Sequence, residues 1–89
     1  MYDISYHSEV TNDISLIGSG DKKRIKIAIE SKLMVDPVRF GKPLQYSLKG
    51  LRSFRVGDYR IVFVLIKTEI FVVLIAHRSV VYEKAIKRI

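Results

Sequence analysis

Residues 51–66 read Leu-Arg-Ser-Phe-Arg-Val-Gly-Asp-Tyr-Arg-Ile-Val-Phe-Val-Leu-Ile, and this segment predicts a β-hairpin. Ser53 and Arg55 alternate with large apolar residues, which is typical of a strand that packs one face on helices and presents polar groups on the other. Gly57-Asp58 is a linker of the two-residue hairpin type. Residues 59–66 are too apolar and too rich in β-branched side chains for an edge, so they predict a central strand.

The segments that flank this hairpin continue the same pattern toward the C-terminus. Lys67-Thr68-Glu69 predicts a turn, and the apolar run 70–76 predicts another buried strand. Ser79 is placed to cap a last helical turn over 81–86. Residues 36–50 contain two prolines and two glycines among mixed polar residues, which indicates an ordered connecting loop.

The N-terminal third predicts one strand and two helices. Alternation over 2–6 indicates a strand with one buried face. Ser8 is a plausible N-cap for a short helix that ends at Gly18, and Asp21 for a longer helix that must end before Asp36-Pro37. We expect the two helices to form an antiparallel hairpin.

The length and the element order together define the fold class. A chain of 89 residues forms one compact domain, 1–89, with no room for a second core. We expect an α+β fold in which an N-terminal strand, a two-helix hairpin and a three-stranded antiparallel meander are followed by a short C-terminal helix. The N-terminal strand completes a four-stranded sheet. Cysteine is absent, which excludes disulfides and thiolate metal sites and favours a reducing, cytoplasmic setting.

The charge of +7 is distributed unevenly along the chain. Residues 1–21 contain four carboxylates and no Lys or Arg, whereas the remaining 68 residues carry a net charge of +11. Such a field attracts polyanions, which include nucleic acid, anionic lipid and acidic proteins, although a basic domain with solvated lysines has the same composition. The first residues lack the pattern of a signal peptide, and the apolar run 70–76 is too short to span a bilayer, so we expect no membrane association.

Several classes of chemistry lack the residues that they require. The sequence contains no cysteine pair, no His-x-x-x-His, no phosphate-binding Gly-x-x-x-x-Gly-Lys-Ser/Thr and no carboxylate cluster. We therefore expect a site without metal or cofactor.

The residues that remain suit chemistry at a phosphate. Arg55, Arg60, Arg78, His77 and Tyr82 fall at the ends of the predicted strands and in the segments that follow them. RNA cleavage without metal requires a 2′-hydroxyl attack, cations that stabilise the charge on the nonbridging oxygens, and a proton donor for the leaving 5′-oxygen. Arginine suits the second task because its planar fork donates two parallel hydrogen bonds to phosphate. A tyrosine can stack on an unpaired base or donate a proton.

Four segments together resemble the RelE/ParE superfamily of bacterial and archaeal toxins. They are Asp36-Pro-x-Arg-Phe-Gly-Lys-Pro-Leu, Leu48-Lys-Gly, Phe54-Arg-Val-Gly-Asp-Tyr-Arg-Ile-Val-Phe and Ile75-Ala-His-Arg-Ser-x-Val-Tyr82. The resemblance implies the RelE-like fold, two helices packed on a small antiparallel sheet. It also implies a toxin of a type II toxin–antitoxin system. RelE-type members are endoribonucleases (mRNA interferases, a class of hydrolase) that enter the ribosomal A site, cleave messenger RNA without metal and so inhibit translation. A cognate antitoxin protein holds them inactive in a hetero-oligomer.

The resemblance assigns roles to the candidate residues. Arg60, Arg78, His77 and Tyr82 match catalytic positions, with Arg60 and Arg78 on the phosphate, Tyr82 stacked on the nucleotide and His77 as a candidate proton donor. Phosphate-binding positions are Arg55, Arg60, Arg78 and Lys49. The chain departs from the pattern at Ser53, where RelE-type nucleases often carry a second cation, and this leaves the general base unassigned. Arg52 is adjacent, but strand alternation directs it to the opposite face.

Each candidate also has a structural interpretation. Arg60 can pair with Asp58, His77 can be a hydrogen-bonded strand-end histidine, and Tyr82 can pack against the sheet. His7 stands alone after the first strand and is interpreted as structural or solvated.

Two other functions remain open at this point. One is a ParE-type toxin that inhibits DNA gyrase without nuclease activity, and the other is an inactive basic domain that binds RNA or a partner.

Overall fold

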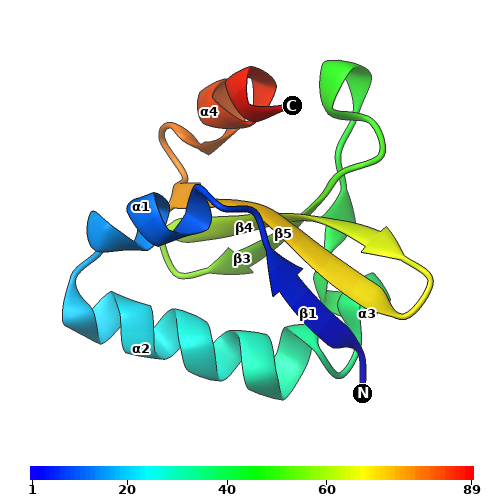
Figure 1. Cartoon of the computed structure of the whole chain (residues 1–89), viewed down its shortest axis with the longest axis horizontal. Helices are drawn as coiled ribbons and strands as arrows, with labels where there is room; N and C mark the ends of the chain where they lie inside the picture. Colours follow the sequence, from blue (N-terminus) through cyan, green and yellow to red (C-terminus); the bar gives the residue numbers. More distant parts are fainter.

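The molecule is built around a five-stranded sheet with the strand order β1–β5–β4–β3–β2 (Figure 1). The structure is a computed structural model that describes all residues 1–89. The strands are β1 (Asp3–Tyr6), β2 (Lys42–Pro43), β3 (Arg52–Val56), β4 (Tyr59–Ile66) and β5 (Glu69–His77). β1 runs parallel to β5, and the other neighbours are antiparallel.

The predicted meander of β3, β4 and β5 is confirmed. Val56 pairs with Tyr59, so Gly57 and Asp58 form the two-residue turn, and the φ of +58° at Gly57 is a conformation that glycine adopts without steric cost. The second hairpin turns at Lys67 and Thr68, and Lys67 adopts a φ of +55° without being a glycine.

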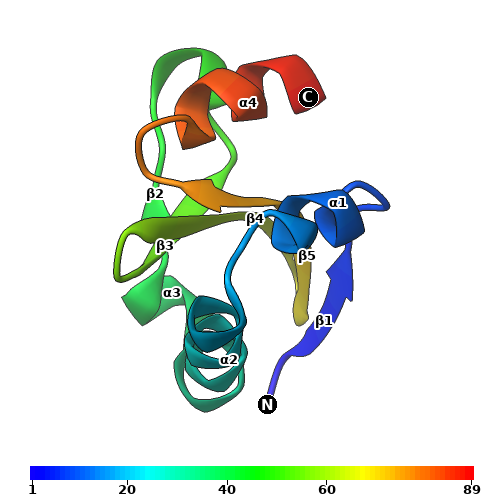
Figure 2. The ribbon, with the colours of Figure 1, turned by 90° about the vertical axis from the view of Figure 1, so that its left-hand side faces the viewer.

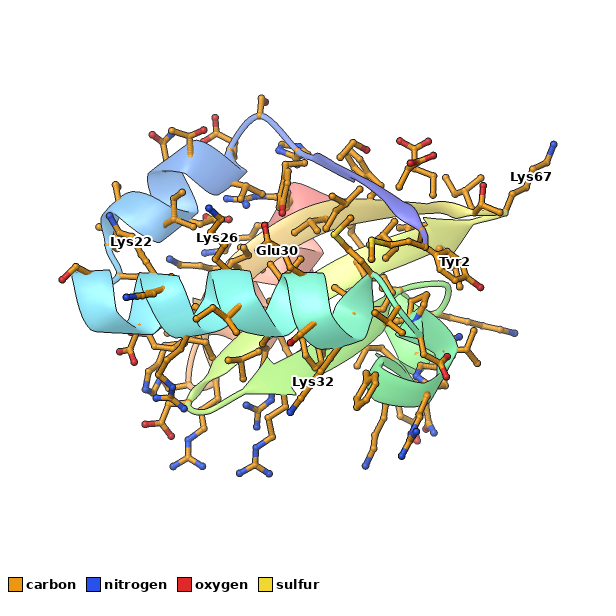
Figure 3. The ribbon with its side chains drawn as sticks, turned by 90° about the horizontal axis from the view of Figure 1, so that it is seen from below. Tyr2, Lys22, Lys26, Glu30, Lys32 and Lys67 are labelled. Atoms are coloured by element: carbon orange, nitrogen blue, oxygen red, sulfur yellow. The ribbon has the colours of Figure 1, made fainter.

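Helices cover both faces of the sheet (Figure 2). They are α1 (Val10–Ser15), α2 (Ser19–Ala28), α3 (Pro37–Phe40) and α4 (Val81–Arg88). A π-helical turn, η1 (Ile29–Leu33), continues α2, and a 3-10 turn, η2 (Tyr46–Leu48), precedes β3. Viewed from below, α2 lies across one face of the sheet beside α1 (Figure 3), whereas α4 lies on the other face (Figures 1 and 2).

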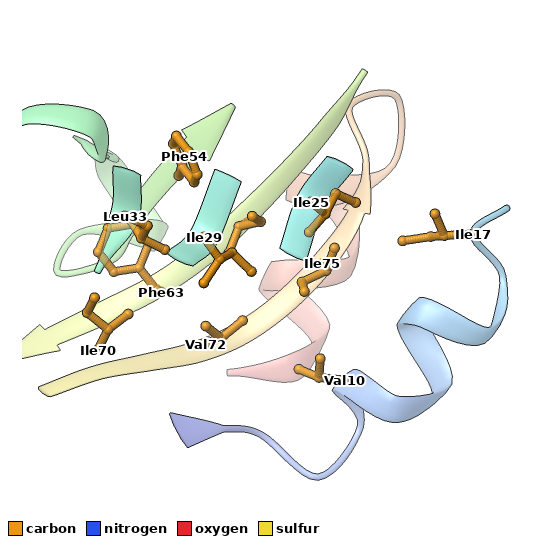
Figure 4. Packing of buried hydrophobic residues seen from close by; sticks show 11 residues of the cluster. Val10, Ile17, Ile25, Ile29, Leu33, Phe54, Phe63, Ile70, Val72 and Ile75 are labelled. Atoms are coloured by element: carbon orange, nitrogen blue, oxygen red, sulfur yellow. The ribbon is translucent and has the colours of Figure 1, made fainter. Parts of the chain in front are cut away.

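The larger hydrophobic cluster lies between the sheet and α2 (Figure 4). Ile25, Ile29 and Leu33 recur at helical spacing and pack on side chains from the lower face of the sheet. Phe63, at the centre of β4, is fully buried among them. We call this side of the sheet the α2 face.

A second cluster of eight buried residues lies on the opposite side, which we call the α4 face. Val81 and Ala85 of α4 are fully buried against Val62 of β4 and Leu74 of β5. Both sides of β4 and β5 are therefore covered, and this explains why their sequences are almost continuously apolar.

The segment from 36 to 50 differs from the prediction of a connecting loop and a four-stranded sheet. It contains α3, η2 and the fifth strand, β2, which pairs with Arg52 and Ser53. β2 is two residues long and ends in Pro43, a residue that strands tolerate at a sheet edge because it cannot donate to a ladder. An element this short has no periodicity for sequence analysis to detect.

The predicted caps of three helices are wrong. α1 begins after Glu9, whose N–H donates to Nδ1 of His7 at 3.0 Å, so the structural interpretation of His7 is confirmed. α2 begins two residues before Asp21, which lies in the first turn of the helix, where a carboxylate is favoured by the helix dipole. The N-cap of α4 is Val80 rather than Ser79.

A buried ion pair joins the two ends of the chain at a β-bulge. The β4–β5 register shifts between Val62 and Phe63, which leaves Val73 as the extra residue. Arg88 donates to both carboxylate oxygens of Asp13, at 2.6 and 3.0 Å, and to the carbonyl of Val73 at 3.1 Å. The N–H of Ile75 donates to the same carboxylate at 3.1 Å. Asp13 and Arg88 thus provide hydrogen-bond partners for backbone groups of β5 beyond the end of β1, and their ion pair holds α4 on the sheet.

Candidate nucleic-acid interface

Arg55 and Arg60 are direct cross-strand neighbours in the β3–β4 hairpin. Residues paired in this way place their Cβ atoms roughly 4.5–5.5 Å apart on the same face of a sheet. Arg60 also pairs with Ala76, which belongs to the α4-face cluster, so both arginines lie on the α4 face. Like charges in direct opposition destabilise a hairpin, so a bound anion would reduce the repulsion between the two guanidinium groups.

No carboxylate neutralises the arginine pair. Nη1 of Arg60 donates to the carbonyls of Gly57 at 3.4 Å and Tyr59 at 3.2 Å, which orients the guanidinium along the turn. Arg55 is exposed and forms no side-chain hydrogen bond. The structural interpretation in which Arg60 pairs with Asp58 is not what the structure has.

Arg78 lies beside the same turn. Its backbone N–H donates to the carbonyl of Asp58 at 2.7 Å, which ties the end of β5 to the hairpin. Its Nε is 3.8 Å from Oδ1 of Asp58, and both side chains are more than half exposed. An exposed pair at this distance contributes little to stability, so the Arg78 guanidinium is free to exchange the carboxylate for another anion.

His77 is separated from the arginine pair by the sheet. It pairs with Tyr59, and its ring meets the Tyr59 ring edge-on at a centroid distance of 5.6 Å. Tyr59 packs against the α2-face cluster, so His77 lies on the α2 face as well. Nδ1 accepts the backbone N–H of Ser79 at 3.1 Å and lies 2.8 Å from its hydroxyl. The neutral ring therefore carries its proton on Nε2.

Tyr82 and Lys49 lie on the α4 face with the arginines. Tyr82 is in the first turn of α4 and remains 42% exposed, while its neighbour Val81 is fully buried. Lys49 is exposed and directly follows η2, which packs against α4. The structure thus brings Arg55, Arg60, Tyr82 and Lys49 to one face, places Arg78 beside the turn and leaves His77 on the other face.

Ser53 and Arg52, which precede the arginine pair in β3, are not placed to bind phosphate at this site. Ser53 is 9% exposed, so the position where a second cation was considered lies within the packed part of the α4 face. Its hydroxyl has no hydrogen-bond partner. Arg52 pairs with Phe63 and reaches the carbonyl of Val38 at 3.5 Å on the α2 face, as alternation predicts.

Comparison with known proteins identifies the family. Residues 4–82 match the family model described as the ParE toxin of the type II toxin–antitoxin system, parDE. The chain belongs to this toxin family. Over 33 residues the toxin is 52% identical to Toxin RelE of Mycobacterium tuberculosis, a match that covers 37% of this chain and 34% of that relative. The toxin thus matches about a third of the length of this curated relative.

Solved structures show the same fold. The toxin–antitoxin complex RelBE2 from Mycobacterium tuberculosis gives a TM-score of 0.81 at 24% identity, covering 86% of this chain and 98% of that chain. The DinJ–YafQ complex from E. coli gives 0.69 at 21% identity, covering 92% and 99%. The membership in the RelE/ParE superfamily that the sequence predicts is therefore confirmed, and the α+β, RelE-like fold is confirmed apart from the extra strand and helices.

One cation that contacts the turn at Gly57, Arg24, was not found by sequence analysis. Arg24 of α2 lies against Gly57, because a Cβ placed on that glycine would stand 2.9 Å from Nη2 of Arg24 and 3.5 Å from its Cζ. Nothing in the spacing of the sequence connects residue 24 with residue 57, so only the packing of α2 on the sheet reveals the contact.

An apolar groove of about 590 Å³ lies apart from these residues, between β1, α1 and α2. Figure 3 shows Lys22, Lys26 and Glu30 along the side of α2 that faces α1, at the rim of this groove. Burial, and to a lesser extent the charge of Glu30, raises the pKa of Tyr6 above its usual value of 10.0. None of the predicted site residues lines the groove. The toxin has no helix of the length and hydropathy that a membrane span requires.

Proposed function

We propose that the toxin is a ribosome-dependent endoribonuclease that cleaves messenger RNA in the A site, and that its α4 face binds the RNA. The observation that carries this proposal is the cross-strand pair Arg55 and Arg60, which has no carboxylate partner and lies on the same face as the half-exposed Tyr82. Such a pair suits a phosphodiester because each guanidinium offers a planar set of donors to nonbridging oxygens.

The proposed reaction needs no metal. The 2′-hydroxyl of one nucleotide loses its proton to a base and its oxygen forms a bond to the adjacent phosphorus. The bond from phosphorus to the 5′-oxygen breaks, and the leaving oxygen takes up a proton. The products are a 2′,3′-cyclic phosphate and a 5′-hydroxyl. Arg55 and Arg60 stabilise the charge that develops on the phosphate, with Arg78 and Lys49 binding nearby phosphates.

The proton donor in this proposal is Tyr82. It lies on the α4 face, as the arginine pair does, and is exposed enough to stack on a base as well. His77 lies on the α2 face and can act only if the RNA passes around the end of the sheet. The structure offers no carboxylate beside Arg55 and Arg60, so the general base stays unassigned.

The protein partner in this proposal is a cognate antitoxin that forms a cytoplasmic hetero-oligomer with the toxin. Two solved relatives are toxin–antitoxin complexes. An acidic segment would complement the net charge of +7 and cover the arginine pair.

The experiment that tests the nuclease proposal is primer extension on messenger RNA bound to programmed ribosomes. We expect wild-type toxin to cut in the A-site codon and to leave 5′-hydroxyl ends. Arg60→Ala and Tyr82→Ala should each reduce the cleavage rate by about 10²-fold or more, and both should relieve growth arrest. Lys32→Ala removes an exposed charge from the opposite side of the molecule and serves as the matched control.

The family model supports a second candidate, inhibition of DNA gyrase, because its description names ParE. A supercoiling assay with purified gyrase separates the two. Intact message together with inhibited gyrase would refute the nuclease proposal. If Arg60→Ala and Tyr82→Ala both remain fully toxic, the proposed site is wrong for either target.

A further inference from the structure

The turn at Gly57 is contacted by arginines from both sides of the sheet. Arg60 approaches from the α4 face and donates to the carbonyl of Gly57 at 3.4 Å. Arg24 approaches from α2, and its guanidinium carbon lies 3.5 Å from the position that a Gly57 side chain would occupy. One glycine therefore separates two cations that belong to opposite faces.

Arg24 retains most of its hydrogen-bonding capacity. Its side-chain hydrogen bond is a long one, 3.4 Å from Nη1 to Oδ1 of Asp21, and the two side chains are 64% and 43% exposed. Such a pair within one helix turn contributes little to stability. The guanidinium has five N–H donors, so it can bind an oxyanion without breaking a buried interaction.

The absence of a side chain at Gly57 lets the Arg24 guanidinium lie close to the backbone of the turn. The φ of +58° already favours glycine there, and a Cβ would also stand 2.9 Å from Nη2 of Arg24. The bare backbone of the turn thus leaves a cationic strip that runs from Arg55 and Arg60 over the turn to Arg24. Asp58 and Asp21 are the carboxylates along the strip, and both are exposed in weak pairs.

We propose that Arg24 binds a second phosphate of the RNA strand, so that the strand passes from the α4 face over the Gly57 turn to the α2 side. The ligand is single-stranded RNA, and the interaction is with its backbone rather than with a base. This inference rests on the proposed function, because it extends the RNA site at Arg55 and Arg60. It assigns Arg24 a positioning role at a phosphate beyond the scissile one.

Binding of a labelled, 2′-O-methylated RNA decamer to the full-length toxin tests the proposal, since the modification removes the attacking hydroxyl and isolates binding. When a protein neutralises one fewer phosphate of a single strand, the slope of log K against log salt becomes shallower by about 0.7. We expect Arg24→Ala and Arg24→Gln to reduce the slope by that amount. The glutamine variant keeps much of the side-chain stem, so agreement between the two variants excludes an effect of altered packing.

Lys22→Ala is the matched control, because it removes one charge from the same helix on the side that faces α1 (Figure 3). Its slope should remain that of the wild type. If both Arg24 variants behave like Lys22→Ala while Arg60→Ala reduces the slope, the inference is overturned and the proposed function stands. If Arg60→Ala also leaves the slope unchanged, the RNA site itself is wrong and both proposals fail.

Discussion

The carboxylate of Asp13 is buried, and its two oxygens accept hydrogen bonds from Arg88 and from the backbone of Ile75. Removing one partner of a buried ion pair leaves an uncompensated charge and costs about 3–5 kcal/mol. We therefore expect Arg88→Ala to lower the free energy of unfolding by about 3 kcal/mol, since Ile75 still donates to the carboxylate. Chemical denaturation followed by circular dichroism measures this loss.

Lys87→Ala provides the control for that prediction. Lys87 is exposed and adjacent in the sequence, so its loss should change the unfolding free energy by less than about 0.5 kcal/mol. Equal stabilities of the two variants would mean that the ion pair does not hold α4 on the sheet.

The placement of the candidate site residues was predictable only where strand alternation is regular. Alternation in β3 correctly put Arg55 outward and Arg52 on the opposite face. In β5 the bulge at Val73 inserts one residue, and a one-residue shift moves every later side chain to the other face. Without the bulge at Val73, His77 would share a face with Phe71 and Arg60. The bulge has no sequence signal, because its neighbours are all apolar.

At the scale of elements, the junction between α3 and β2 depends on close packing of Gly41. A Cβ at this buried glycine would overlap the ring of Phe63, which is fully buried in the α2-face cluster, and would stand 2.9 Å from the carbonyl of Pro37. Gly41→Ala should therefore destabilise the toxin by about 1–3 kcal/mol, as overpacked cores do. Thermal unfolding measures the change.

The same substitution at Gly20 should have the opposite effect on stability. Gly20 lies in the first turn of α2 with no atom within 4 Å of an added Cβ, so alanine should stabilise the helix by about 0.5 kcal/mol. If Gly41→Ala left the melting temperature unchanged or raised it, as Gly20→Ala should, the packing argument for Gly41 would fail.

Most of the elements that sequence analysis found are long, and those that it missed are short. β1 has only four residues and was found by its alternation. β4 and β5 have eight and nine residues and α2 has ten, enough for a period to appear. α3 has four residues and β2 has two, and both are fixed by contacts with β3 and η1 rather than by their own pattern. Tertiary packing determines the structure of such segments, so their sequences resembled that of a loop.

At the scale of the whole molecule, the two faces of the sheet are closed to different extents. The α2 face is closed by a cluster of 11 buried residues. The α4 face is closed by a smaller cluster of eight, and the arginine pair lies on the part of that face that the helix leaves open. Because the proposed RNA site is built on β3 and β4, its geometry is fixed by strands that the core holds in place.

This arrangement predicts how stability is distributed across the molecule. β4 and β5 have a strand on each side and side chains packed on both faces, whereas β1 and β2 are edge strands. Local opening is cheapest where few interactions are broken, so amides in the middle of β4 and β5 should exchange with deuterium only through global unfolding. The amides of β1 and the single amide of β2, that of Lys42, should exchange orders of magnitude faster.

Native-state hydrogen exchange by NMR, read residue by residue, measures this order. The amides of Val62 and Leu74 are the reference for global unfolding, because both side chains are fully buried on the α4 face. In Arg88→Ala these amides should become less protected by the same free energy that denaturation reports, whereas the fast-exchanging amide of Lys42 in β2 should be unchanged. Protection in β2 equal to that of β4 would show that the sheet opens as one unit and that the edge strands are not its weak points.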